Sequence, residues 1–291
     1  MSHSEKIHVD LSGAPQTMLA TFYAKALDAG LPEPILGDQL ARDIAQRIDY
    51  DWSKTTITAG RSPAVTTRSA HFDEWCRAFL SRHAEAVVLH LGCGLDGRYF
   101  RLNPGPGIEW YDIDYPDVAR LRSQLYPTRD HYHVVSASVT DPAWLANIAD
   151  SRPVLAIGEG LTMYLKEDDG IALFRRIVDH FPYGELQIAL FRRIVDHFPY
   201  GELQFDAFNK FGIKTQWSNA VVRRSGATLY WGIDRPEDLI RAIPKLQLLE
   251  WESPFDSETF QRTKAGYRLL ARAMSLSPTL RYMAQYHRYA F

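Results

Sequence analysis

The feature that most constrains this chain is a series of short apolar runs that alternate with helical patterns through its middle. Four such runs cover residues 85–94, 107–116, 131–138 and 152–160, and helical patterns such as "YPDVARLRSQLYP" lie between them. Strands that alternate with helices imply a doubly wound α/β fold with a mostly parallel, buried sheet. We expect the runs at 223–234, 246–253 and 280–291 to supply its last strands.

Before these runs the pattern is helical. Three amphipathic segments occupy residues 14–34, 37–52 and 68–84, with glycine and proline ending the first. No linker rich in proline, glycine and serine divides the 291 residues. We therefore expect one domain, with residues 1–84 as a helical N-terminal cap on a Rossmann-like core at 85–291.

The overall composition is that of a soluble globular protein. The net charge is −2 from 33 basic and 35 acidic side chains, without the clustered basic residues that nucleic-acid binding requires. No apolar run is long enough to cross a membrane, and the N-terminus lacks a signal-peptide pattern. With only two cysteines, the chain is expected in the reducing cytoplasm, with no nucleic-acid or membrane partner.

One stretch is written twice, since residues 171–187 and 188–204 are identical. Each copy holds an amphipathic helix, a Pro-Tyr-Gly break and the start of a strand. The copies cannot fuse into one long helix, because Pro182 and Gly184 stop the first. Either copy one supplies the helix and copy two the strand, with about 182–200 as a surface insertion, or copy two takes both roles; hybrid registers are also open. An extruded amphipathic helix predicts self-association.

The glycine-rich turn "LGCGLDG" carries the main functional signal. Gly92, Gly94 and Gly97 follow a strand in the dinucleotide-binding spacing, and glycines there let a ligand approach the backbone. Asp112 and Asp114 end the next strand about 20 residues later, where a carboxylate can accept hydrogen bonds from a ribose. A nucleoside cofactor is therefore expected, and a nicotinamide-dependent oxidoreductase remains an alternative.

The segments "LGCGLDGRYFRL", "YDIDYPDV" and "GEGLTMYL" resemble the leucine carboxyl methyltransferase superfamily, and in particular its bacterial polyketide-methylating branch. The likeness runs from about residue 17 to 250. It implies a class I (Rossmann-like) methyltransferase fold and S-adenosylmethionine as cofactor.

The resemblance also implies roles for single residues. Glycines 92 and 94 would pass beneath the cofactor, two arginines would hold its methionine carboxylate, and acids would hold its ribose and face its reactive end. The expected cofactor-binding set is Lys25, Arg68, Gly92, Gly94, Arg98, Asp112, Asp114, Ser138 and Glu159. Ser138 stands where many members carry an aspartate for the adenine amino group, and Gly97 stands where a threonine is usual.

The implied reaction is methyl transfer to an oxygen of a small molecule, either a carboxyl or a phenolic hydroxyl. A carboxylate needs no general base, whereas a phenol would benefit from one, for which His90 and Tyr164 are weak candidates. A non-catalytic cofactor-binding protein is a further alternative. Two arginines, Arg223 and Arg224, are candidates for clamping an acidic acceptor. An apolar acceptor pocket could draw on Phe205, Phe208, Trp217, Tyr230 and Trp231.

No metal site is expected. His131 and His133 share one strand face but have no third ligand nearby in the sequence.

Overall fold

The computed structural model describes residues 6–9, 14–149, 151–181 and 201–291. Within them a seven-stranded sheet has the order β5-β4-β3-β6-β7-β9-β8, and the first five strands in this order are parallel. Only β9 runs against its neighbours β7 and β8. The sheet is therefore doubly wound and mostly parallel, as predicted. Its strands are β3 (Ala86–Leu91), β4 (Ile108–Asp114), β5 (Tyr132–Ser136), β6 (Val154–Gly158), β7 (Gly201–Phe208), β8 (Gln247–Glu252) and β9 (Ala284–Ala290).

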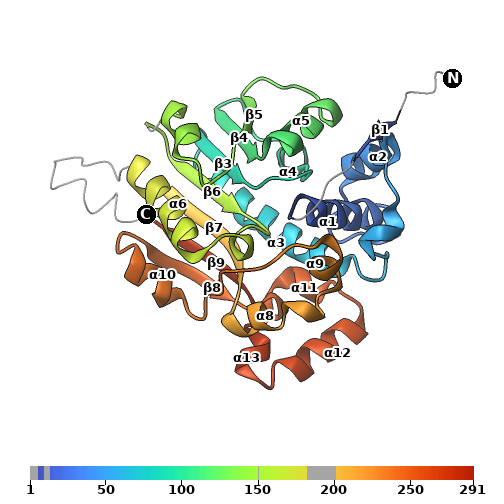
Figure 1. The fold of residues 1–291 in the computed structure, drawn as a ribbon. Coiled ribbons are helices and arrows are strands. Elements are labelled where there is room, and N and C mark those ends of the chain that lie inside the picture. Colours follow the sequence, from blue (N-terminus) through green and yellow to red (C-terminus); the bar gives the residue numbers. More distant parts are fainter. Residues whose placement is uncertain (1–5, 10–13, 150, 182–200) are drawn as a thin grey trace.

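Helices cover both faces of this sheet (Figure 1). On one face α3 (Pro63–Leu80) packs Phe72, Trp75 and Phe79 against Val88 of β3. On the other face α6 (Glu167–His180) and α10 (Pro236–Ala242) pack against Leu89 and the other side of the same strands. Alternate residues of β3 thus enter opposite cores, as a strand buried on both sides requires.

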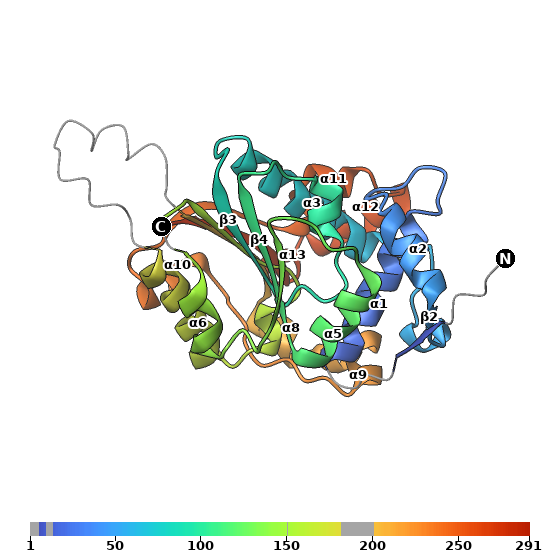
Figure 2. The ribbon, with the colours of Figure 1, turned by 90° about the horizontal axis from the view of Figure 1, so that it is seen from above.

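The N-terminal region forms a third cluster beside the sheet (Figure 2). Its helices α1 (Ala14–Asp28) and α2 (Gln39–Arg47) pack together through Leu19, Phe22 and Ile44. Two short strands that were not predicted, β1 (Ile7–His8) and β2 (Ile48–Asp49), pair in parallel there. The turn that follows is the 3-10 helix η1 (Trp52–Thr55).

Smaller helices connect these elements. The α-helices are α4 (Arg98–Leu102), α5 (Pro116–Leu125), α8 (Lys210–Lys214), α9 (Ala220–Ser225), α11 (Glu258–Gln261), α12 (Ala265–Met274) and α13 (Pro278–Arg281). The 3-10 helices are η2 (Pro142–Asn147), η3 (Thr162–Tyr164), η4 (Gln216–Ser218) and η5 (Pro254–Asp256).

Among the three late runs, 246–253 and 280–291 hold strands β8 and β9, but 223–234 was wrongly predicted as a strand. Residues there complete α9 and then pass the sheet, with only an isolated bridge between Gly232 and Phe208.

The structure selects one arrangement of the duplicated stretch. Copy one supplies α6 and copy two supplies β7, so the second alternative and the hybrid registers do not occur. Residues 182–200, and with them the expected surface helix, lie outside the described residues. In α6, Leu173 and Phe174 of copy one are fully buried in the core. Self-association through an extruded helix stays a prediction.

The residues that flank the copies explain this selection. A Cβ on Gly170, which precedes copy one, would lie 2.1 Å from Cζ3 of Trp231. Copy two is preceded by Gln187, whose side chain could not occupy that position. Conversely, only copy two continues into Asp206, which accepts a hydrogen bond from the Gly160 amide at 2.6 Å; copy one would place Ala189 there.

Candidate functional site

A cavity of about 760 Å³ opens at the carboxyl ends of β3, β4 and β6. Ligands of open α/β sheets bind at this edge, and the volume lies in the range of small-molecule sites. Helix α1, the segment before α3 and residues 219–230 complete its wall. The charged or titratable groups of the wall are Lys25, Arg61, Arg68, His90, Cys93, Asp96, Asp114, Tyr115, Glu159, Tyr164, Tyr230 and Tyr267.

The glycine turn lies on the floor of this cavity. Gly92 and Gly94 have φ angles of +62° and +52°, which side chains other than glycine rarely tolerate. A Cβ on Gly94 would also approach Cγ of Met18 to 2.6 Å, so the turn lies directly against α1. The Gly94 amide donates to Oδ2 of Asp114 at 2.7 Å, which ties the turn to the end of β4.

The two acids of β4 have different roles. Asp114 lines the cavity, and within the described residues its oxygens accept hydrogen bonds only from the Gly94 and Tyr115 amides, each at 2.7 Å. Each oxygen therefore keeps a lone pair for a ligand hydroxyl. The two amide hydrogen bonds lower the pKa of Asp114, but burial outweighs them and raises the pKa above its ordinary value.

Asp112 lies outside the cavity, which corrects the expectation that it could hold the ribose. It is fully buried, and its carboxylate makes three hydrogen bonds: with the ring Nδ1 of His90 at 2.9 Å, from the indole of Trp110 at 2.9 Å and from the hydroxyl of Tyr132 at 2.6 Å. It also pairs with Arg122. Burial alone would raise the pKa of Asp112, but Arg122 and His90 outweigh it and lower the pKa to about 2.

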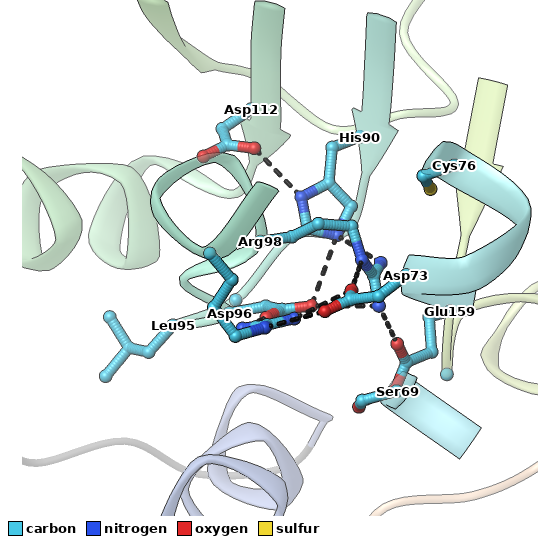
Figure 3. A network of polar contacts seen from close by, with 12 residues as sticks. Ser69, Asp73, Cys76, His90, Leu95, Asp96, Arg98, Asp112 and Glu159 are labelled. Atoms are coloured by element: carbon cyan, nitrogen blue, oxygen red, sulfur yellow. Dashed lines mark hydrogen bonds and ion pairs between the residues drawn. The ribbon is translucent and has the colours of Figure 1, made fainter. Parts of the chain in front are cut away.

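Arg98 is likewise directed inward rather than into the cavity (Figure 3). It is 0% exposed, its Nε donates to Oδ1 of Asp73 at 2.8 Å, and its Nη2 donates to Glu159. The expectation that it would hold the methionine carboxylate is therefore corrected, because Arg98 is fully buried and does not line the cavity. Its effect on the site passes through Glu159, whose carboxylate it orients.

Glu159 and Arg68 form the charged centre of the cavity wall. Arg68 donates from Nε to Glu159 Oε1 at 3.0 Å and from Nη1 to Asp206 Oδ2 at 2.9 Å. Ser69 adds a hydroxyl hydrogen bond to Glu159 at 2.7 Å. Burial by itself raises the pKa of Glu159, but Lys25, Arg98 and Arg68 outweigh burial and hold the pKa well below its ordinary value. The carboxylate is therefore ionised at neutral pH.

Lys25 reaches the same wall from α1. Its Nζ lies 3.1 Å from Oδ2 of Asp96, and both side chains are buried. Asp96 also accepts from Arg101 through its Oδ1 at 2.7 Å, and α4 begins without a side-chain cap. The wall thus presents cations and carboxylates side by side, which suits the zwitterionic end of an amino-acid group.

The two candidate bases are poorly suited to removing a proton. His90 lines the cavity, but its Nδ1 is engaged by Asp112 and its Nε2 faces Arg98 at 3.4 Å. Burial raises the pKa of Tyr164, which keeps its hydroxyl protonated at neutral pH, although a hydrogen bond with Thr17 lowers it. Within the described ranges the wall therefore favours an acceptor that is already ionised.

Other predicted residues fall outside the cavity wall. Ser138 hydrogen-bonds with Thr140 at 2.8 Å and does not line it, contrary to the adenine-site expectation. Arg223 and Arg224 end α9 and also do not line it. Among the aromatic candidates, Phe208 and Tyr230 line the cavity, whereas Phe205, Trp217 and Trp231 do not.

Two histidines were considered as metal ligands. His131 and His133 each contact one oxygen of Glu109 at 2.8 Å. Within the described residues, no group of three or more histidine, cysteine or acidic side chains could hold a metal ion. In the same part of the chain no helix is long and apolar enough to span a bilayer.

Sequence reasoning missed several residues that build the site, chiefly Asp73, Asp206 and Arg61. Asp73 and Asp206 are buried carboxylates that fix Arg98 and Arg68. A buried acid within a helix or strand is the signal that could have identified them, because it needs a cationic partner. Arg61 gave no such signal, since it belongs to an exposed loop.

The sequence of this chain matches one known protein family over more than half of its length. A family model described as leucine carboxyl methyltransferase matches residues 18–178. The tetracenomycin polyketide synthesis O-methyltransferase TcmP of Streptomyces glaucescens is 38% identical over 97% of this chain and 98% of its own length. The S-adenosyl-L-methionine-dependent methyltransferase dpfgK of Gibberella zeae is 36% identical over 84% of each chain.

Solved structures support the fold. A Thermobifida fusca protein provisionally named a methyltransferase superimposes with a TM-score of 0.56 at 17% identity, covering 92% of this chain and 93% of its own. A DUF574 family protein of Streptomyces avermitilis gives 0.54 at 10% identity, covering 96% and 97%. The architecture is that of a class I methyltransferase.

Proposed function

Because the chain belongs to the leucine carboxyl methyltransferase family, we propose that it transfers a methyl group from S-adenosylmethionine to an oxygen of a small apolar acid, most simply a carboxylate. The observation that carries this proposal is a single cavity at the carboxyl edge of the sheet. It brings together the glycine turn, Asp114 with its free lone pairs, and the ionised Glu159. The names of the relatives support the cofactor and the oxygen acceptor.

The residues present fit this cofactor. Gly92 and Gly94 line the cavity without side chains, and Asp114 can accept from ribose hydroxyls. Arg68 and Glu159 provide opposite charges for an amino-acid carboxylate and ammonium. When bound, the cofactor supplies an electrophilic methyl group on a sulfonium. The protein contributes to methyl transfer by orienting the acceptor and by excluding water from the site.

Several features favour a carboxylate acceptor over a phenol. A carboxylate is ionised at neutral pH and needs no general base. The ring nitrogens of His90 are engaged in contacts with the protein. The hydroxyl of Tyr164 stays protonated, so it can donate a hydrogen bond to the acceptor but cannot remove a proton from it. The acceptor would therefore bind as an anion and be oriented by donors, without proton transfer in the reaction. A cytoplasmic setting is part of the same proposal and accords with two buried free cysteines.

The test is calorimetric titration with S-adenosylmethionine, S-adenosylhomocysteine and NADH, followed by tritium transfer to aromatic carboxylic acids. Micromolar binding of the two sulfur compounds and none of NADH is expected. Binding of NADH alone would return the assignment to a nicotinamide-dependent oxidoreductase. Cofactor binding without transfer to any acid or phenol would favour the non-catalytic alternative.

A further inference from the structure

Among the described residues, the cationic side chains of the cavity wall are paired with carboxylates, with one exception. Lys25 pairs with Asp96, and Arg68 pairs with Glu159. Arg61 also lines the cavity but makes no ion pair with any residue in the described part of the chain. Its guanidinium donates from Nη1 to the carbonyl of Thr56 at 3.4 Å. An unpaired arginine on a ligand cavity has donors in a fork geometry that suits a carboxylate.

The loop that carries Arg61 is held in place from several sides. Thr56 has a φ of +61°, an unusual conformation for a β-branched residue that persists only where surroundings enforce it. The hydroxyl of Tyr267, another cavity residue, donates to the Gly60 carbonyl at 2.7 Å. The hydroxyl of Ser62 donates to the Ala59 carbonyl at 2.9 Å. Arg61 therefore starts from a fixed backbone position at the cavity rim.

Its place relative to Arg68 follows from the chain. Arg61 lies in the turn that precedes α3, and Arg68 lies in the second turn of that helix; both line the cavity, as do Ala64 and Val65 between them. The wall between residues 219–230 and α3 is largely apolar. Its apolar members include Ile57, Val65, Met163, Val221, Val222 and Leu229. An acceptor that extends from Arg61 along this wall must therefore have an apolar body.

We propose that Arg61 binds a second ionised group of the acceptor, away from the end at which methyl transfer occurs. The acceptor is then an elongated apolar or aromatic acid with acidic groups at both ends. This inference rests on the proposed function, since Arg68 and Glu159 mark the reacting end only if the cofactor binds beside them. Arg61 is a specificity residue under this proposal and touches no reacting atom.

The test compares two probes that differ in one carboxylate. Protein saturated with S-adenosylhomocysteine is titrated with 2-naphthoate and with 2,6-naphthalenedicarboxylate. The wild type is expected to bind the diacid at least about 10-fold more tightly, as a charged hydrogen bond implies. Arg61→Gln should remove this preference without changing affinity for the monoacid, and Arg61→Lys should retain part of it. Arg223→Gln is the matched control, because Arg223 is an exposed arginine outside the cavity.

The outcomes distinguish a failure of the role of Arg61 from a failure of the proposed function. Wild-type protein that binds S-adenosylhomocysteine but shows no preference for the diacid overturns the role of Arg61, whether binding of the probes is tight or undetectable. The same holds if Arg61→Gln keeps the preference or if Arg223→Gln loses it equally. Failure to bind S-adenosylhomocysteine would instead overturn the proposed function.

Discussion

The strongest test of the site concerns the two acids of β4, Asp112 and Asp114. They stand two residues apart on one strand, yet the structure makes one a buried partner of Arg122 and leaves the other at the cavity. Replacing each by asparagine keeps its shape and removes its charge. Asp112→Asn should cost folding stability, whereas Asp114→Asn should chiefly cost cofactor affinity.

The magnitude follows from the partners. A carboxyl pKa lowered from 3.8 to about 2 means that the folded state favours the ionised form by roughly 2 kcal/mol. Asp112→Asn also leaves Arg122, which is 0% exposed, without an anion. Breaking a buried pair in this way costs about 3–5 kcal/mol of unfolding free energy. For a chain of 291 residues that lowers the melting temperature by roughly 5–8 °C.

Asp114→Asn should lower the unfolding free energy by only about 1–2 kcal/mol, because the amide oxygen keeps one of the two backbone donors, Gly94 or Tyr115, and the other loses its acceptor. It should weaken binding of S-adenosylhomocysteine by roughly 10-fold or more, since a charged hydrogen bond to the ribose is lost. Scanning calorimetry and titration calorimetry on both variants give the comparison. If Asp112→Asn loses under 1 kcal/mol, or if Asp114→Asn is the less stable of the two, the division of roles is refuted.

Three further predictions follow from the same structure. Deleting residues 188–204 leaves both flanks of the selected copies intact, so affinity for S-adenosylhomocysteine by calorimetry should be unchanged; weaker binding would contradict the selection of copies. Gly170→Ala places a Cβ 2.1 Å from an indole carbon and should destabilise the fold by about 1–3 kcal/mol in urea unfolding, whereas Gly266→Ala, with no atom within 4 Å, should be neutral or better. Stability should fall as the pH drops below about 4.5, because the unfolded chain then binds protons that the lowered pKa values of Glu159 and Asp112 keep off the native state; acid titrations of unfolding should show a shallower slope for Asp112→Asn.

The sequence by itself determined the sheet and the position of the turn. The apolar runs at 85–94, 107–116, 131–138 and 152–160 became strands β3 to β6, because strands buried on both faces need apolar side chains in both directions. The glycines marked the turn, since positive φ angles there exclude most other residues. The apolar runs and the backbone conformation of the turn each depend on a few neighbouring residues, so the sequence alone is enough to predict them.

Only the tertiary structure decided which charged residues face the ligand. Spacing along β4 could not distinguish Asp112 from Asp114, because alternation places both on one side of the strand. The presence of Arg122 beside the first made the difference. In the same way, the hydrogen bond of Arg98 to Asp73, a residue 25 positions away in the sequence, holds the Arg98 side chain in the protein interior.

The duplicated stretch shows the same division. Two identical segments have identical propensities, so no local property could choose between them. The choice came from what each copy must adjoin, namely a glycine small enough to lie under Trp231 at one end and Asp206 beside Arg68 at the other. Long-range packing and the pairing of buried charges are set by residues distant in the chain, and for that reason they emerge only once the chain is folded.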